Sequence, residues 1–252
     1  MTIRVKICGI THPDDAELAI EAGADLIGLN FVPESPRCVD PKLAAEIAER
    51  VAGRAERVGV FRNAEIEEIE RILRHVDLDR LQFHGEETEE EVEAVDLPVI
   101  KSIRGADLEA AEQYPGTIVL LDHPDGGGGT GKSWNWADAA TLVESGYDVI
   151  LAGGLSPENV AQALAELGDP PWGVDVASGV ETPDRRKDAK KVTQFVNAVR
   201  VQESRSVRAL ESGKGVDPGP PRSAPVHRRA CAARPTGRAA SVSTAAATCR
   251  RH

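Results

Sequence analysis

The stretch Val5-Lys6-Ile7-Cys8-Gly9 opens the ordered pattern of the chain as a short apolar strand that ends in a thiol and then a glycine. The last side chain of such a strand lies at the mouth of the sheet that the strand enters, and the glycine after it lets the chain turn. If the following segments repeat strand and then helix, Cys8 lies on the rim where such sheets build their active sites.

The rest of the first 200 residues repeats that unit. Apolar runs of strand length alternate with segments whose apolar residues recur at helical spacing, most clearly over 66–76. The expected strands are 3–8, 25–31, 57–61, 80–83, 97–102, 117–122, 148–152 and 172–176. Such alternation implies a parallel sheet with right-handed crossovers, and eight units are the number that closes into a barrel. We predict a single α/β domain over 1–200, a (βα)8 TIM barrel; an open doubly wound sheet is the alternative.

The composition changes after residue 200. Pro, Ala, Arg, Ser and Thr dominate there, and ten Lys/Arg stand against three Asp/Glu. We predict that 201–252 is a low-complexity basic tail without regular structure. An arm for nucleic acid or membrane is the alternative, although the basic residues are scattered. Residues 1–200 hold the other 20 bases and 38 acids, which would repel a phosphate backbone, so we expect no nucleic-acid partner.

Hydropathy and cysteine usage favour a cytoplasmic protein. No apolar run approaches the roughly 18 to 20 residues that a membrane-spanning helix needs, and the N-terminus lacks the layout of a signal peptide. The four cysteines form no CxxC pair, so we expect neither a disulfide framework nor a zinc site. We also expect no membrane partner, and the acidic, lysine-poor first 200 residues would suit a salt-rich cytoplasm.

Two ionisable residues end predicted strands on opposite sides of the barrel. Cys8 ends the first strand; it is either a small buried hydrophobe or, as a thiolate, a base or nucleophile. We do not expect Lys6 to be the cation that lowers the pKa of this thiol, because it lies lower on the same strand face. Asp122 ends the sixth strand, where a solvated loop acid is the alternative. Together, an acid and a base across a pocket can protonate an oxygen and remove a carbon-bound proton.

Glycine-rich loops follow the last three predicted strands. The loop 126–133 matches the phosphate-binding pattern GxxxxGK[ST], but a nucleotide site needs the Lys and Ser in the first helical turn, and Asn135 is the better helix cap here. We therefore expect an active-site loop instead of a nucleoside-triphosphatase. Its central residues are Gly128, Gly129, Thr130 and Gly131.

The loops after strands seven and eight favour a phosphorylated small-molecule substrate. Gly153 and Gly154 follow strand seven, and Ser178 and Gly179 follow strand eight. Glycines let backbone amides approach an anion, and these two loops commonly hold phosphate in this barrel, whereas either pair alone would be ordinary turn chemistry.

Two further side chains are candidates for substrate contacts. Arg37 follows strand two and offers a planar fork for a carboxylate, although a surface arginine is the alternative. His84 follows strand four; it either positions substrate or is a hydrogen-bonded structural histidine.

In order and spacing, these segments closely resemble the phosphoribosylanthranilate isomerases of tryptophan biosynthesis. The motifs that carry the resemblance are KICG (6–9), SPR (35–37), VGVF (58–61), LQFHG (81–85), GGTGK (128–132), LAGGL (151–155), GVDV (173–176) and SGVE (178–181). No single motif decides it, and the full set spans nearly all of residues 3–200.

The resemblance implies an Amadori rearrangement without cofactor or metal, which converts N-(5-phosphoribosyl)anthranilate to 1-(2-carboxyphenylamino)-1-deoxyribulose 5-phosphate. It implies that Asp122 is the general acid that protonates the ribose ring oxygen, and that Cys8 is the general base that removes the proton from the second sugar carbon. It places Arg37 at the anthranilate carboxylate and Asp175 beside the sugar. The implied phosphate-binding residues are Gly153, Gly154, Ser178 and Gly179.

The chain departs from the family pattern in its last loop. Arg185-Arg186 precede Lys187-Asp188 where the family usually has a glycine, and Ala177 stands where serine is frequent. Two functional alternatives stay open. One is a dual-substrate isomerase that also acts in histidine synthesis, although that relative uses paired aspartates; the other is a phospho-ligand-binding barrel without catalysis. We expect a monomer or a homodimer.

Overall fold

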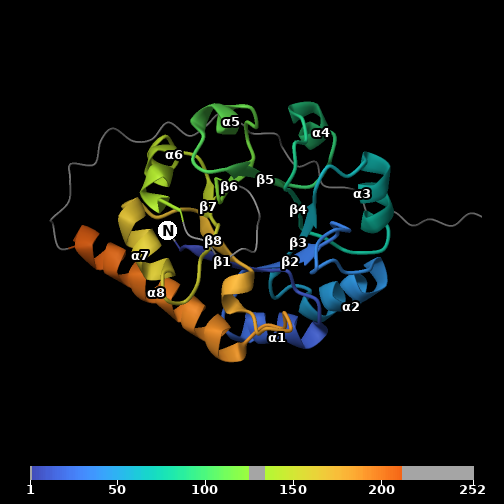
Figure 1. Ribbon diagram of the computed structural model, residues 1–252, viewed down its shortest axis with the longest axis horizontal. Helices are drawn as coiled ribbons and strands as arrows, with labels where there is room; N and C mark the ends of the chain where they lie inside the picture. Colours follow the sequence, from blue (N-terminus) through green and yellow to red (C-terminus); the bar gives the residue numbers. More distant parts are fainter. Residues whose placement is uncertain (1, 125–133, 212–252) are drawn as a thin grey trace, which may run out of the picture. The chain divides into compact units, whose positions relative to one another are not determined.

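A computed structural model of the protein describes residues 2–124 and 134–211. Parallel strands close into a barrel in the order β1 to β8, and β8 pairs with β1 (Figure 1). The strands are β1 (Arg4–Cys8), β2 (Leu26–Asn30), β3 (Glu56–Phe61), β4 (Arg80–Phe83), β5 (Val99–Arg104), β6 (Ile118–Asp122), β7 (Val149–Leu151) and β8 (Gly173–Val176). The closed (βα)8 barrel is thus confirmed, and the open sheet is wrong.

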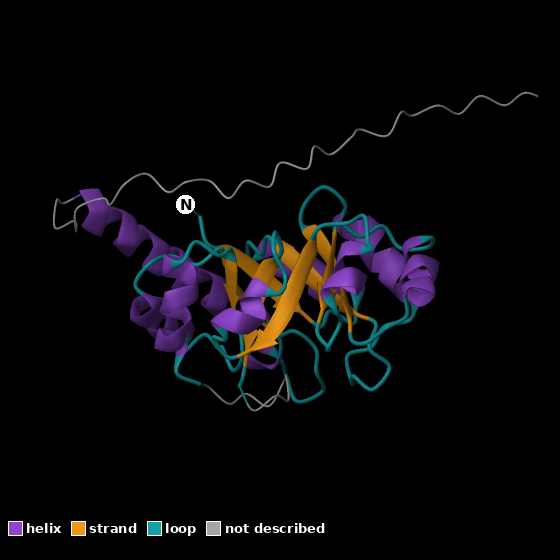
Figure 2. Cartoon of the chain, turned by 90° about the horizontal axis from the view of Figure 1, so that it is seen from above, coloured by secondary structure: helices purple, strands orange, loops and turns teal. Residues whose placement is uncertain are grey.

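Helices surround the strands, as the turned view shows (Figure 2). They are α1 (Pro13–Glu21), α2 (Pro41–Val51), α3 (Ile66–Leu73), α4 (Glu89–Glu93), α5 (Leu108–Glu112), α6 (Ala140–Glu144), α7 (Val160–Leu167) and α8 (Ala189–Glu211), with 3-10 helices η1 (Trp136–Ala139) and η2 (Ser178–Val180). None of the helices in the described ranges combines the length and apolar composition that a bilayer crossing needs.

Local sequence explains where several helices begin. Thr88 and Glu91 form a capping box at α4, and the Asp40 side chain accepts the backbone N–H groups of Lys42 and Leu43 at α2. Asn135 precedes η1 but does not cap it as we expected; its side chain donates to Asp138 Oδ1 at 2.7 Å instead.

Alternation along the strands divides the core into two parts. On β1 to β7, even-numbered residues point into the barrel, where an inner cluster packs around Leu26, Ile100 and Leu120. On β8 the order is reversed, so that Asp175 points inward to Lys6 while Val174 packs outward. Odd-numbered residues such as Ile7 and Leu121 pack outward against the helices. Trp172 packs against the inner cluster, with the Arg4 guanidinium 4.4 Å from the centre of its ring. The inner apolar layers therefore leave the opposite end of the barrel, at the strand carboxyl ends, for polar side chains.

The last helix crosses the predicted boundary at Arg200. Helix α8 continues to Glu211, and Glu203 Oε1 accepts a hydrogen bond from the Ile3 backbone at 3.0 Å. The expectation of no regular structure after Arg200 is therefore wrong for 201–211, because amphipathic spacing up to Val199 carries the helix into a polar segment. The rest of the predicted tail lies outside the described residues.

Candidate active site

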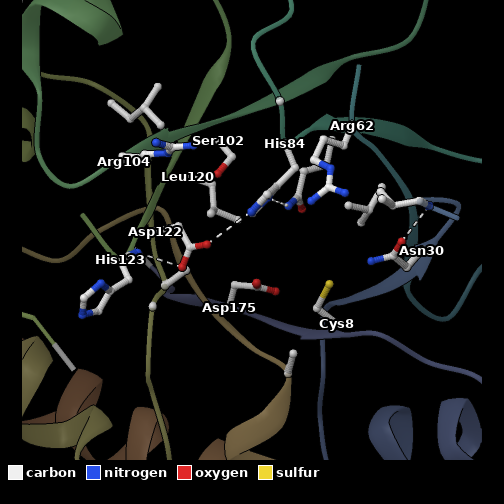
Figure 3. A pocket seen from close by; sticks show the side chains of 18 of the residues that line it. Cys8, Asn30, Arg62, His84, Ser102, Arg104, Leu120, Asp122, His123 and Asp175 are labelled. Atoms are coloured by element: carbon white, nitrogen blue, oxygen red, sulfur yellow. Dashed lines mark hydrogen bonds and ion pairs between the residues drawn. The ribbon is translucent and has the colours of Figure 1, made fainter. Parts of the chain in front are cut away.

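A cavity of about 830 Å³ opens at the carboxyl ends of the strands. Most of the side chains and loops singled out in the sequence line it, namely Cys8, Arg37, His84, Asp122, Gly153, Gly154, Asp175 and Ser178. Figure 3 shows Cys8, Asp175 and Asp122 pointing toward the same space from three different strands or strand ends. Gly179 is not among the lining residues, and Gly128, Gly129, Thr130 and Gly131 lie outside the described residues.

Cys8 lies above a buried ion pair. The Lys6 side chain, only 1% exposed, donates to Asp175 Oδ1 at 2.9 Å. Burial would lower the pKa of Lys6, but Asp175 and Cys8 together raise it. Burial raises the pKa of the Cys8 thiol and outweighs the opposing effect of the Lys6 ammonium. Discounting Lys6 as the cation near this thiol was therefore wrong: neighbours two apart on one strand face the same side and stay within electrostatic reach.

The absence of a side chain at Gly28 makes room for the thiol. A Cβ at this position of β2 would lie 2.7 Å from Cys8 Sγ and 3.2 Å from Lys6 Nζ. The glycine that pairs with Cys8 in the sheet is thus part of the site.

Asp122 is held by two hydrogen bonds at the end of β6. Its Oδ2 lies 3.2 Å from His84 Nε2, and its Oδ1 accepts the His123 backbone N–H at 2.8 Å. Burial would raise the pKa of Asp122, but the contact with His84 and the His123 amide hold it below its usual value. Gln82 Nε2 in turn lies 3.1 Å from His84 Nδ1, so the carboxylate, the imidazole and the amide form a chain (Figure 3).

Arg37 is fixed by a partner from the far end of the chain. Its Nε and Nη2 donate to the two carboxylate oxygens of Glu181 at 2.8 and 2.7 Å. Lys187, whose side chain is fully buried, donates to Glu181 Oε1 at 2.8 Å and to the Cys8 carbonyl at 2.7 Å. Burial lowers the pKa of Lys187, although Glu181 opposes this. Two of the five N–H donors of Arg37 therefore bind Glu181, and both N–H groups of Nη1 have no partner among the described residues.

The two predicted phosphate loops are packed tightly against their surroundings. Gly153 has a φ of 78°, and a Cβ there would lie 2.7 Å from the His123 backbone nitrogen and 2.8 Å from Trp134 Nε1. A Cβ on Gly179 would lie 2.1 Å from the Leu155 carbonyl oxygen. Only glycine fits these two positions, which explains why both loops carry it.

The departure from the family pattern has a structural counterpart. Arg185 adopts a φ of 64°, the left-handed conformation that favours glycine. The neighbouring Arg186 makes a bidentate contact with buried Asp15 at 2.9 to 3.0 Å. The loop thus keeps a glycine-like backbone without the glycine, anchored by an ion pair to α1.

Sequence reasoning missed the partners of the site residues. It did not consider Gln82, Glu181 or Lys187 as site residues, although Gln82 and Glu181 lie inside the motifs that carry the family resemblance. Strand alternation alone would have placed Gln82 and Lys6 inside the barrel, where a polar side chain needs a partner. Within 2–124 and 134–211, no three His, Cys, Asp or Glu side chains gather closely enough to hold a metal ion.

Known proteins resemble this chain in sequence and in fold. The family model described as N-(5'-phosphoribosyl)anthranilate (PRA) isomerase matches residues 5–198. An N-(5'-phosphoribosyl)anthranilate isomerase of Pseudomonas putida is 45% identical over 205 residues, which cover 79% of this chain and 98% of that protein. The crystal structure of phosphoribosyl anthranilate isomerase from Thermus thermophilus superposes with a TM-score of 0.73 at 38% identity, covering 79% of this chain and 99% of the other.

A third relative has been solved with a ligand. It is a phosphoribosyl anthranilate isomerase in complex with reduced 1-(o-carboxyphenylamino)-1-deoxyribulose 5-phosphate, with a TM-score of 0.72 and 34% identity over 79% of this chain and all of that one. The matched family model covers nearly the whole barrel, from β1 into α8. The chain therefore belongs to the N-(5'-phosphoribosyl)anthranilate isomerase family, the isomerases of tryptophan biosynthesis.

Proposed function

We propose that this chain carries out the Amadori rearrangement of N-(5'-phosphoribosyl)anthranilate with Asp122 as general acid and Cys8 as general base. The observation that supports this most strongly is the shared cavity, in which a carboxyl and a thiol from opposite strands meet the glycine loops after β7 and β8. Asp122 protonates the ribose ring oxygen, and the ring opens to a Schiff base. Cys8 removes the proton from the second sugar carbon, and the enolamine that results tautomerises to the ketone.

The resting charges of the two groups are the reverse of those that the reaction needs. Burial favours a Cys8 thiol, and the contact with His84 favours an Asp122 carboxylate. The active form, a thiolate with a carboxylic acid, carries the same total number of protons and is a minor state of the same pair. Because both forms share one net charge, their ratio does not change with pH. Lys6 favours the active form by stabilising the thiolate.

Arg37 and the two glycine loops are assigned to opposite ends of the substrate. Glu181 orients the Arg37 guanidinium, and we assign its remaining Nη1 to the anthranilate carboxylate. Gly153, Gly154 and Ser178 are assigned to the phosphate, with Gly179 allowing the loop after β8 to approach Leu155. Asp175 is assigned to the sugar hydroxyls while it holds Lys6. Gly128, Gly129, Thr130 and Gly131 are assigned to the active-site loop.

Turnover of freshly made phosphoribosylanthranilate by the purified protein, followed by the loss of its fluorescence, tests the assignment. Cys8→Ala and Asp122→Asn are each expected to lower kcat by at least roughly 100-fold, the range expected for acid-base catalysis, while affinity for the reduced product analogue is kept. Arg37→Ala is expected to weaken binding of that analogue. Cys38→Ala is the matched control, because Cys38 is an exposed cysteine outside the cavity and should turn over normally.

Near-normal kcat in Cys8→Ala or Asp122→Asn would refute the assigned roles. An unaltered protein that binds the analogue without turning over the substrate would favour a phospho-ligand-binding barrel. The same assay with the aminoaldose of histidine synthesis distinguishes a dual-substrate isomerase.

We further assign catalysis to the barrel of residues 1–200 and none to the tail of 201–252. The contact between Glu203 and Ile3 ties the first turns after Arg200 to the barrel, so their contribution is to stability. We propose a monomer or homodimer in the cytoplasm that acts on a phosphorylated small molecule and binds neither nucleic acid nor membrane; light scattering on the purified protein would establish the assembly.

A further inference from the structure

Gln82 is a buried amide with half of its hydrogen-bonding capacity unused. It points into the barrel from β4, is 2% exposed, and lines the active-site cavity. Its Nε2 lies 3.1 Å from His84 Nδ1, while its Oε1 has no hydrogen-bond partner among the described residues. A buried carbonyl oxygen without a hydrogen-bond partner lowers the free energy of unfolding, so its presence in a native site calls for a functional explanation.

The orientation of this amide determines which nitrogen of His84 carries the proton. With Nε2 of Gln82 donating, His84 Nδ1 must be bare, and the ring proton lies on Nε2, from where it donates to the Asp122 carboxylate across 3.2 Å. If the amide turns by half a revolution, Oε1 accepts a proton from Nδ1. The bare Nε2 can then accept only from a protonated Asp122.

We propose that Gln82 is a positioning residue that selects the tautomer of His84, so that His84 holds Asp122 as a carboxylate in the empty site and as a carboxylic acid when substrate is bound. The proposal rests on the proposed role of Asp122 as general acid. It gives the unpaired Oε1 a function, because that oxygen is the acceptor in the second state. It also explains how a carboxyl held in its ionised form can deliver a proton.

The change balances in protons. The His84 Nε2 proton passes to Asp122 along their hydrogen bond, and the N–H bond breaks as the O–H bond forms. Nδ1 takes up the proton that the Cys8 thiol releases, carried by water in the cavity. The ring stays neutral in both states, Cys8 becomes the thiolate base, and Asp122 becomes the acid. Substrate favours this state because its ring oxygen can only accept a hydrogen bond and therefore pairs with the carboxylic acid and not with the carboxylate. Delivery of the Asp122 proton to the ring oxygen breaks the hydrogen bond from Asp122 to His84 Nε2.

Nitrogen NMR of the intact protein labelled with ¹⁵N-histidine measures the tautomer directly, because protonated and bare ring nitrogens have distinct shifts. His84 is assigned by the resonance lost in His84→Gln. We expect the proton on Nε2 in the free protein and on Nδ1 after saturation with ribose 5-phosphate, which keeps the closed ring and its oxygen; the reduced product analogue, an open chain, should leave the proton on Nε2. Gln82→Met, of similar volume without the amide, should keep the proton on Nε2 in both states. Its kcat should fall about tenfold with KM unchanged, the fold-change of one lost hydrogen bond.

Gln82→Glu supplies the complementary test, since an ionised carboxylate only accepts hydrogen bonds and should fix the proton on Nδ1 in both states. An unchanged tautomer in the unaltered protein on binding ribose 5-phosphate would overturn the proposal. So would a Gln82→Met protein with normal kcat. The NMR experiment requires only that the ligand binds. Failure of the proposed function would show separately, as normal turnover by the Asp122→Asn protein.

Discussion

Gly28→Ala is expected to disable the enzyme without removing any functional group. The new Cβ would lie 2.7 Å from Cys8 Sγ, whereas non-bonded heavy atoms rest at about 3.5 Å or more, so the thiol must retreat by roughly 1 Å. A cysteine has one side-chain torsion, and a change of rotamer would carry the sulfur away from the substrate. A displacement of about 1 Å at a reacting group costs on the order of 100-fold in rate, so kcat should fall by that factor.

The assay is kcat on phosphoribosylanthranilate, measured alone and in a Cys8→Ala background. If Gly28→Ala acts by displacing the thiol, the double variant should have a kcat less than about threefold below that of Cys8→Ala alone. Gly59→Ala is the matched control: its Cβ would meet Leu78 at 2.5 Å and Phe61 at 2.9 Å, so it should lower stability and leave kcat of the folded protein unchanged. A Gly28→Ala enzyme whose kcat is within threefold of normal would refute the reasoning. So would a further loss of about 100-fold in kcat when Gly28→Ala is added to Cys8→Ala.

Three other changes test the surroundings of the site. The pKa of Cys8 is raised above its usual 9.0, so on the alkaline side kcat/KM should fall above pH 9, where the pair loses its last proton. Lys6→Met should move that fall to higher pH, and an alkaline fall centred below pH 8 would contradict this. Arg185→Gly should stabilise the fold by up to about 1.5 kcal/mol, because it relieves left-handed strain of roughly 1 to 2 kcal/mol and adds unfolded-state flexibility that costs about 0.5 to 1 kcal/mol. A lower Tm would count against it. Truncation after Glu211 should leave kcat and Tm unchanged. Truncation after Arg200 should keep kcat and lower the free energy of unfolding by about 1 to 3 kcal/mol, because the hydrogen bond from the Ile3 backbone to Glu203 is lost. An inactive shorter protein would show that the end of α8 serves catalysis.

The barrel could be predicted from the sequence because its signals are local. Each strand is a short apolar run, each helix has its own spacing, and eight such units leave few ways to close a sheet. The ends of the short helices were harder, since α4 and α5 are one turn or little more and depend on packing. The true end of α8 was missed because a polar segment without apolar period can continue a helix that is already anchored.

The candidate site was predictable where a residue ends a strand or lies in the loop that follows it. Cys8 and Asp122 could be placed on one rim from topology alone, because parallel strands bring all their carboxyl ends to one face. Partners could not be placed in the same way. Glu181 is 144 positions from Arg37 in the sequence, and nothing in either segment indicates which charge the arginine meets.

The hairpin after β8 shows why those distant partners matter. Lys187 donates to the carbonyls of Cys8 and Ala177 and to Glu181, and so joins the end of β1 to the loop assigned to phosphate. Removing one member of such a buried network leaves another charge uncompensated, which typically costs about 3 to 5 kcal/mol. That cost exceeds the roughly 1 to 2 kcal/mol of strain at Arg185, so the hairpin can keep a left-handed arginine at this position and still orient Arg37.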